Sequence, residues 1–237
     1  MHGVKKDISH LKKIEKFIKT FETHKISSIF CVPYTILGAS TSAVNSKYVK
    51  IGSQDISYHS ENFGPFTGSV SSKMVKDLNC THVILGHSEK RADGDNDKNI
   101  SKKIDLAFKN SLHVILCVGE SIEDYKRKKS FDIIKKQINK AFLNKKNLKK
   151  IIIAYEPIWS IGTGIVPNNE YLDKFFDRLN KYINKKFKIN IPLLYGGSVS
   201  KNNVIYLKKI KSCRGFLIGG SSLKSKDYID IIKKYYN

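Results

Sequence analysis

Short runs of consecutive apolar residues alternate with longer amphipathic segments, and this alternation constrains the fold more than any other feature. Ile151–Tyr155, for example, has no polar residue at alternate positions, as expected for a parallel strand covered on both faces. Strands that alternate with helices indicate βαβ units and a parallel sheet. The predicted strands are Ser28–Val32, Val49–Ser53, His82–Leu85, 114–118, Ile151–Tyr155, Leu193–Tyr195 and 215–218.

Eight helical patterns accompany these seven strands, whereas an eight-fold barrel begins with a strand. We therefore predict an α/β fold, a (β/α)8 barrel that lacks its first strand in the chain as given. A chain of 237 residues suits one barrel of about 250 residues, so residues 1–237 are expected to form a single domain without a linker. The helices are predicted at 9–23, 36–45, 71–78, 97–110, 131–142, 169–186, 201–207 and 226–236.

The formal charge of +22 raises the question of a nucleic-acid partner, because clustered Lys and Arg supply most non-specific affinity for phosphate backbones. Near the start of the chain, however, lysines alternate with Leu11, Ile14 and Ile18 at helical spacing and so form a solvated face. No basic motif with interleaved aromatic residues stands out. We expect no nucleic-acid partner, and a polyanion-binding protein is the alternative that a salt-dependent titration would expose.

The four cysteines, Cys31, Cys80, Cys117 and Cys213, are far apart, with no C-x-x-C pair and no histidine at metal-ligand spacing. This usage indicates reduced intracellular thiols and no metal site. The chain opens on a charged amphipathic segment instead of a signal peptide, and it has no apolar run of 18 residues. We therefore expect a cytoplasmic protein without a membrane partner.

The segment A-Y-E-P-I-W-S-I-G-T-G at 154–164 combines a strand end, a carboxylate and a loop. Glu156 lies where the strand emerges, which is the edge where the active sites of parallel barrels assemble. Gly162 and Gly164 bracket a segment that can move as a lid. The segment therefore indicates a base beneath a closing loop, and a solvated glutamate in an ordinary connection is the alternative.

His87 and two glycine-rich turns also follow predicted strands. His87 precedes S-E-K-R, a first helical turn, and a helix N-terminus lowers the pKa of an imidazole and favours its neutral form. The turns at 196–198 and 219–221 follow the last two predicted strands. Barrel enzymes commonly bind phosphate there, because glycines let backbone N–H groups approach it, although either turn alone can be an ordinary turn.

Several strings together resemble the motifs of the triosephosphate isomerase family, in the family's order and over essentially the whole chain. They are F-T-G at 66–68, I-L-G-H-S-E-K-R at 84–91, L-C-V-G-E at 116–120, the segment at 154–164, Y-G-G-S-V at 195–199 and I-G-G-S-S-L at 218–223. The resemblance implies a TIM barrel and the interconversion of dihydroxyacetone phosphate and glyceraldehyde 3-phosphate in glycolysis and gluconeogenesis. It implies no metal or organic cofactor.

The resemblance also implies roles for individual residues. Glu156 would be the base and His87 the neutral electrophile, the assignment for which this family is itself a standard example of pKa tuning. Glu89 would support the site, although an acidic residue in a first helical turn can simply stabilise its helix. The phosphate-binding residues would be Gly162, Ser198, Gly219 and Gly220.

Three positions depart from the family pattern. Ser69 follows F-T-G where the family has Glu, Lys90 replaces the first Arg of H-S-E-R-R, and Arg214 replaces an acidic residue before the last strand. The changes at Ser69 and Lys90 are linked if the acidic residue and the arginine pair across a dimer. The loop Phe66-Thr67-Gly68 still predicts a homodimer.

The start of the chain departs further. Family members carry an N-terminal strand ending in N-W-K-M-N-G or N-W-K-M-H-G, whereas this chain begins M-H-G, so the family's substrate-binding Asn and essential Lys would precede Met1. We expect a natural start upstream and a nearly inactive, poorly stable chain as given; a noncatalytic relative is the main alternative. Another phosphate-binding barrel enzyme would share the glycine-rich turns but not the strings around His87 and Glu156.

Overall fold

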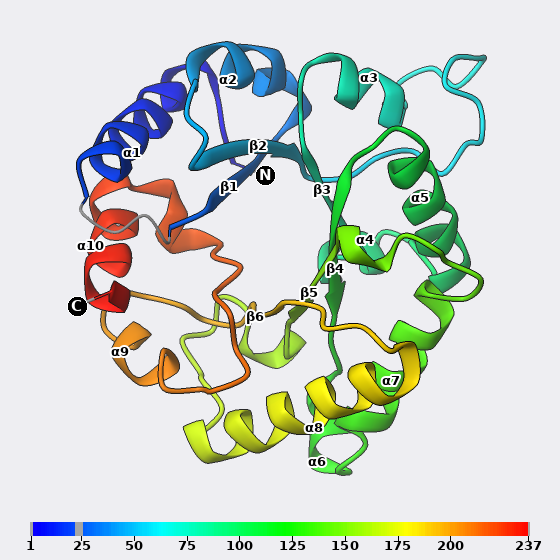
Figure 1. Cartoon of the computed structure of the whole chain (residues 1–237), viewed down its shortest axis with the longest axis vertical. Helices are drawn as coiled ribbons and strands as arrows, with labels where there is room; N and C mark the ends of the chain where they lie inside the picture. The colour runs from blue at the N-terminus through cyan, green and yellow to red at the C-terminus, as the bar shows by residue number, and fades with distance from the viewer. Residues whose placement is uncertain (1, 22–25, 237) are drawn as a thin grey trace.

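The computed structural model describes residues 2–21 and 26–236, and its strands form one parallel sheet in the order β1-β2-β3-β4-β5-β6. Figure 1 shows this sheet curving around a central axis with the helices outside it, which confirms the predicted α/β barrel class. The strands are β1 (Ser28–Val32), β2 (Val49–Ser53), β3 (His82–Leu85), β4 (His113–Val118), β5 (Ile151–Tyr155) and β6 (Leu193–Tyr195).

The prediction of a seventh strand at 215–218 is wrong. In the 215–218 segment only Phe216 forms a bridge, parallel to Tyr195 of β6. The Tyr195 N–H donates to Gly215 at 3.1 Å, and the Leu217 N–H donates to Tyr195 at 2.9 Å. The segment pairs with a strand of only three residues, and among the described residues no backbone ladder supports its other edge. Pairing on one short side is too little to extend the bridge into a strand.

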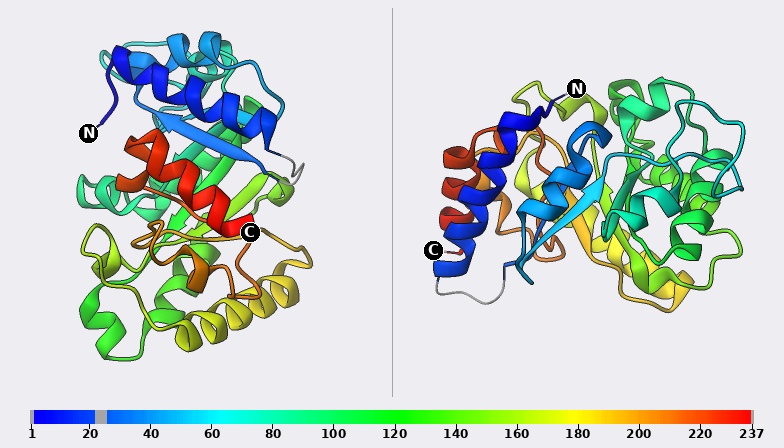
Figure 2. Two further views of the ribbon diagram at one scale, coloured as in Figure 1. Left: turned by 90° about the vertical axis from the view of Figure 1, so that its left-hand side faces the viewer. Right: turned by 90° about the horizontal axis from the view of Figure 1, so that it is seen from above.

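The described residues contain no strand before β1, as predicted, so the outer edges of β1 and of the 215–218 segment remain without ladder partners. Helix α10 (Ser225–Tyr236) packs against β1 near its unpaired edge. Its Tyr228 ring packs at a tilt against Phe30 of β1, with ring centroids 5.2 Å apart, and the Tyr228 hydroxyl donates to Ser28 at 3.2 Å. Figures 1 and 2 show α10 beside α1 on the outside of the same region.

Helices lie in every region where the sequence predicts one. The S-E-K-R turn that was expected to be helical is α4 (Ser88–Ala92), and the 201–207 prediction shrinks to α9 (Val204–Leu207). The short helix α6 (Ile122–Lys126) was not predicted. The 9–23 prediction runs past the end of α1 at Thr20, and its last two residues lie outside the described residues. The helices are α1 (Ile8–Thr20), α2 (Leu37–Ala43), α3 (Ser72–Asp77), α4 (Ser88–Ala92), α5 (Asp97–Lys109), α6 (Ile122–Lys126), α7 (Ser130–Ala141), α8 (Asn169–Phe187), α9 (Val204–Leu207) and α10 (Ser225–Tyr236).

Helix α8 illustrates why these segments are helical. The Asn168 side chain caps its first turn by accepting the Tyr171 N–H at 2.7 Å. Its apolar residues recur at helical spacing and bury one face against the sheet, each contributing roughly 1.5–3 kcal/mol relative to exposure. The fully buried ones are Leu172, Phe176, Leu179 and Ile183. The helix ends where Lys188 adopts a left-handed conformation.

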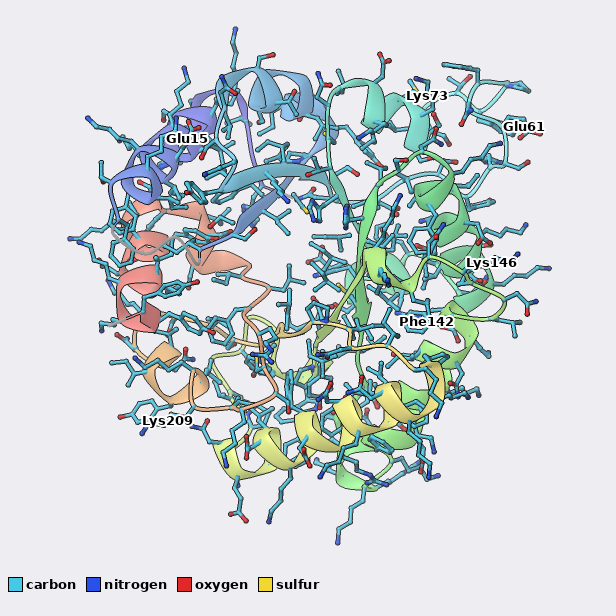
Figure 3. All side chains as sticks on the ribbon, in the orientation of Figure 1. Glu15, Glu61, Lys73, Phe142, Lys146 and Lys209 are labelled. Atoms are coloured by element: carbon cyan, nitrogen blue, oxygen red, sulfur yellow. The ribbon has the colours of Figure 1, made fainter. Side chains whose placement is uncertain are left out.

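The excess positive charge is spread over the outside of the barrel. Lys73, Lys146 and Lys209 point outward on different sides of the molecule (Figure 3). This placement agrees with the interpretation of the lysines as solvated helix faces. Among the described residues, no helix combines the length and the apolar character needed to cross a lipid bilayer.

Candidate active site

Glu156 and His87 meet at the carboxyl edge of the sheet. Glu156 directly follows β5, and His87 follows β3 after Gly86. Because β3, β4 and β5 are parallel neighbours, their ends emerge at one edge. The structure places the His87 Nε2 atom 3.4 Å from the Glu156 Oε1 atom. It therefore brings together the two residues that the sequence proposed as catalytic.

Glu156 is buried to 2% exposure, and this burial raises the pKa of its carboxyl group from 4.5 to about 8. The Cys117 thiol and the Ser88 backbone N–H donate hydrogen bonds to the carboxylate and oppose that rise in pKa, as does the charge of Arg91. A carboxylate with a pKa near neutrality is a stronger base than an ordinary glutamate. This is the property expected of a group that removes a proton from carbon.

His87 is held in one neutral tautomer. The Glu89 backbone N–H donates to the His87 Nδ1 atom at 3.3 Å, which leaves the ring proton on Nε2, the atom that faces Glu156. Burial lowers the pKa of His87, and the nearby Glu89 charge opposes this effect. The lowered pKa was predicted, but its main cause is burial, whereas the prediction named the helix N-terminus. The contact therefore joins a neutral donor to the carboxyl group of Glu156.

Two glycines leave room for Glu156. A Cβ atom on Gly119 would lie 2.0 Å from the Glu156 backbone oxygen, and one on Gly196 would lie 2.7 Å from the Glu156 Cγ atom. Both distances are shorter than real Cβ contacts allow. The sequence predicted Gly196 as part of a phosphate-binding turn, so its contact with the base is a second constraint that sequence reasoning missed.

The loop after Glu156 is held by hydrogen bonds at its base and exposed to solvent at its tip. The Ser160 hydroxyl donates to the Ile165 carbonyl at 2.5 Å, and the Ser198 hydroxyl donates to the Ser160 carbonyl at 2.6 Å. The Gly164 N–H donates back to Ser198 at 3.1 Å. Gly162 at the exposed tip has φ +69°, a conformation that suits glycine. The geometry is that of a small lid resting on the turn at 196–198.

Glu120 anchors the first part of this lid. Its Oε1 atom accepts hydrogen bonds from Tyr155 at 3.0 Å, from the Trp159 indole at 3.2 Å and from Ser130 at 3.2 Å. Its Oε2 atom is buried without a partner, and burial raises the pKa of this carboxyl group. Sequence reasoning quoted Glu120 only as the end of L-C-V-G-E and assigned it no role.

The predicted phosphate-binding residues lie on adjoining turns. Gly219 and Gly220 face open space, and Gly220 begins a short 3-10 helix, Gly220–Leu223. The Ser221 hydroxyl donates to the Val199 carbonyl at 2.8 Å and so connects this turn to the one that holds Ser198. The Ser198 hydroxyl itself is engaged with the lid. The structure thus groups the lid, both turns and the open space beside Gly219.

Helix α4 carries the remaining charged residues near the site. The Glu89 side chain is 80% exposed, and Lys90 pairs with Asp93 at 3.0 Å. Arg91, which sequence reasoning did not select, donates to the Gly86 carbonyl at 2.8 Å and pairs with Asp97 at 2.9 Å. Arg91 therefore holds the segment that carries His87.

A cavity of about 10 Å³ lies beside Glu156 and has room for about one water molecule. Arg91 and Ser88 also line it. Within residues 2–21 and 26–236, no three His, Cys, Asp or Glu side chains form a group that could hold a metal ion. All four cysteines are free.

Comparisons with known proteins show which family the chain belongs to. A sequence model of the family "Triosephosphate isomerase" matches residues 1–235. The chain belongs to the triosephosphate isomerase family. A triosephosphate isomerase from Rhizobium meliloti (strain 1021) is 33% identical, with 99% of this chain and 93% of that protein aligned. One from Mycoplasma mobile (strain ATCC 43663 / 163K / NCTC 11711) is 41% identical over 85% of this chain and 81% of that protein.

A solved structure has the same fold. A crystal structure of triosephosphate isomerase from Bartonella henselae matches with a TM-score of 0.89 at 29% identity. The match covers 100% of this chain and 96% of the other. These findings confirm the predicted TIM barrel and the family resemblance.

Proposed function

We propose that this protein is a triosephosphate isomerase in which Glu156 and His87 interconvert dihydroxyacetone phosphate and glyceraldehyde 3-phosphate. The observation that carries the proposal is the 3.4 Å approach of the neutral His87 Nε2 atom to the buried carboxyl group of Glu156. A base and a hydrogen-bond donor side by side can act on the neighbouring carbon and oxygen atoms of one substrate.

In this mechanism the Glu156 carboxylate removes a proton from the carbon next to the carbonyl group. The His87 Nε2–H donates to the carbonyl oxygen, which gains negative charge as the enediolate forms. Proton exchange between the two substrate oxygens through His87 and return of the proton from Glu156 to the adjacent carbon complete the isomerisation. No proton is consumed overall, because the group that takes it also returns it.

Gly162, Ser198, Gly219 and Gly220 bind the substrate phosphate in this proposal. The open space at Gly219 and Gly220 supports this role, because backbone N–H groups there can approach an anion. Closure of the lid over the phosphate would exclude water from the enediolate, which otherwise can lose phosphate. Glu89 is a supporting residue that orients His87 through its backbone N–H.

The proposal is tested with Glu156→Gln and His87→Gln in an isomerisation assay coupled to a dehydrogenase. Glu156→Gln should abolish turnover while the chain stays folded, because an amide cannot accept the proton. His87→Gln should lower kcat about a hundredfold with a smaller effect on KM, as for loss of a preorganised donor. Near-normal turnover of Glu156→Gln, or an effect of His87→Gln on KM alone, would contradict these roles.

We also propose that the protein acts in glycolysis and gluconeogenesis in the cytoplasm, as one domain spanning residues 1–237 and as a homodimer through the Phe66-Thr67-Gly68 loop. Exposed aromatic surface beside that loop supports the dimer: Phe63 is 73% exposed, and the His59 ring stacks on Phe66 at 3.7 Å. Sedimentation of the protein and of a Thr67→Arg variant tests it, since a charge in the interface should yield monomers.

A nearly inactive relative is the second candidate. One observation favours it: Arg91, the cation that lines the cavity beside Glu156, is already paired with Asp97. The substrate phosphate and the enediolate both carry negative charge, and a buried cation facing them usually contributes several kcal/mol. Turnover about a thousandfold or more below that of the Rhizobium meliloti relative, measured side by side, would favour this candidate.

A further inference from the structure

A second cavity, here named the basal cavity, lies at the end of the barrel opposite the candidate active site. Its volume is about 130 Å³, whereas one water molecule needs roughly 10–15 Å³ by the same measure. It lies between α8 and the connections that lead into β6 and into the 215–218 segment. These connections precede their strands, whereas Glu156 and His87 follow theirs, so the two sites are at opposite ends.

The wall of the basal cavity is mostly polar, and two of its lining residues, Lys211 and Arg214, are basic and exposed to solvent. Ile191 and Pro192 supply its apolar part. None of the lining residues is a carboxylate. The polar lining residues are Asn180, Asn190, Lys211, Ser212 and Arg214.

Acidic residues near the basal cavity do not neutralise these cations. Asp173 of α8 accepts the Lys211 backbone N–H at 2.9 Å, and Asp177 pairs with Lys181 at 2.7 Å. Among the described residues, neither the Lys211 ammonium nor the Arg214 guanidinium lies within ion-pair distance of a carboxylate. Two like charges on one small cavity repel each other, so an anion between them would be attracted by both.

The neutral side chains of the wall supply hydrogen-bond donors. The Asn180 Oδ1 atom accepts a hydrogen bond from Asn184 at 3.3 Å, which leaves the Asn180 NH2 group as the donor available to the cavity. The Ser212 hydroxyl can donate as well. Acceptor-only oxygens that carry negative charge are the chemical partners that match such a wall.

We propose that the basal cavity binds a phosphate group, carried either by inorganic phosphate or by a small phosphomonoester. A dianion matches the two cations in charge, and its tetrahedral oxygens match the planar fork of Arg214 and the separate Lys211 ammonium. The site is independent of the proposed isomerase chemistry, because none of its residues lies at the carboxyl edge of the sheet. It therefore gives the protein a second phosphate site at the opposite end of the barrel.

The experiment is an amide NMR titration of the full chain with sodium phosphate, and separately with glycerol phosphate, at constant ionic strength set by sodium chloride. Saturable shifts are expected at Ser212 and the Asn180 side chain, apart from any at Gly219 and Gly220. Arg214→Gln should weaken the basal-cavity titration at least tenfold, since it removes charge-assisted hydrogen bonds. Lys146→Gln removes one exposed positive charge elsewhere and should leave that titration unchanged.

The two arms identify the ligand: shifts with only one of them assign the cavity to that form of phosphate, and shifts with both assign it to the phosphate group itself. The proposal is overturned if neither compound shifts Ser212, or if Arg214→Gln titrates within twofold of the unmodified chain. Isomerase activity is expected to be the same in Arg214→Gln as in the unmodified chain. Absence of shifts at Gly219 and Gly220 alone would contradict the proposed phosphate site of the isomerase, not this one.

Discussion

Burial of Glu156 should make the protein less stable at high pH, and Glu156→Gln should remove that effect. The carboxyl group has its ordinary pKa of 4.5 in the unfolded chain and a pKa of about 8 in the fold. Between these values the folded chain binds more protons than the unfolded chain, so the free energy of unfolding falls as pH rises. The contribution of the protonated Glu156 carboxyl group to stability is fully present below pH 4.5 and is lost as the pH rises through about 8.

The size of the effect follows from the shift. The two pKa values differ by about 3.5 units (8 minus 4.5), and each unit corresponds to about 1.36 kcal/mol. The ionised carboxylate therefore costs the fold up to about 5 kcal/mol at high pH. Glutamine has nearly the same shape and no charge, so Glu156→Gln should be more stable than the unmodified chain at about pH 9, and this advantage should shrink by several kcal/mol at about pH 5.

The assay is urea unfolding of both proteins at about pH 5 and about pH 9. Any hydrogen bond that the amide makes or loses changes the free energy of unfolding equally at both pH values. The dependence of the stability difference on pH therefore isolates the effect of the charge. Glu61→Gln is the control, because Glu61 is exposed (Figure 3) and its replacement should change the free energy of unfolding by less than about 0.5 kcal/mol. If the stability difference between Glu156→Gln and the unmodified chain does not depend on pH, the raised pKa is refuted.

Three further outcomes are expected. The kcat/KM of the unmodified chain should rise about tenfold per pH unit below a pKa of about 8 and level off above it, because the base must be ionised; a flat profile from pH 6 to 9 would contradict this. Gly196→Ala should lower kcat about a hundredfold, since its Cβ at 2.7 Å must displace Glu156 by about 1 Å, whereas Gly38→Ala, with an ordinary 3.4 Å contact, should not. An added N-terminal strand ending in Asn-Trp-Lys should raise both Tm and turnover by pairing the free edge of β1, and no change in either would refute that reasoning.

Much of the fold was predictable because its signals are local. Unbroken apolar runs mark strands buried on both faces, and the bounds of β1, β2, β3, β5 and β6 agree with the predicted ones. The 215–218 segment was not predictable in the same way. Its apolar residues suit a strand, but strand pairing depends on neighbours that a local pattern does not encode, and here one neighbour is three residues long and the other edge is unpaired.

The candidate site was predictable where the residue type itself indicates acid–base chemistry, as with Glu156 and His87. It was not predictable where a residue acts by its size or by a contact from another strand. Cys117 is buried in the core, but its thiol also donates to Glu156 from the adjacent strand. Gly119 matters because a side chain at this position would collide with the backbone oxygen of Glu156, which is far along the chain. Such roles follow from the register between β4 and β5, which only the folded sheet defines.

The proton content of the site follows from the opposite directions of two pKa shifts. Burial raises the pKa of Glu156 and lowers the pKa of His87, so it disfavours the charged form of each. A pair of imidazolium and carboxylate, which holds the same number of protons, is therefore less favoured than the pair of neutral groups. As pH rises through about 8, the pair changes from two neutral groups to a carboxylate beside a neutral imidazole. Only the second state has both a base for carbon and a donor for oxygen, so the ionisation of Glu156 alone sets the lower pH limit of the proposed reaction.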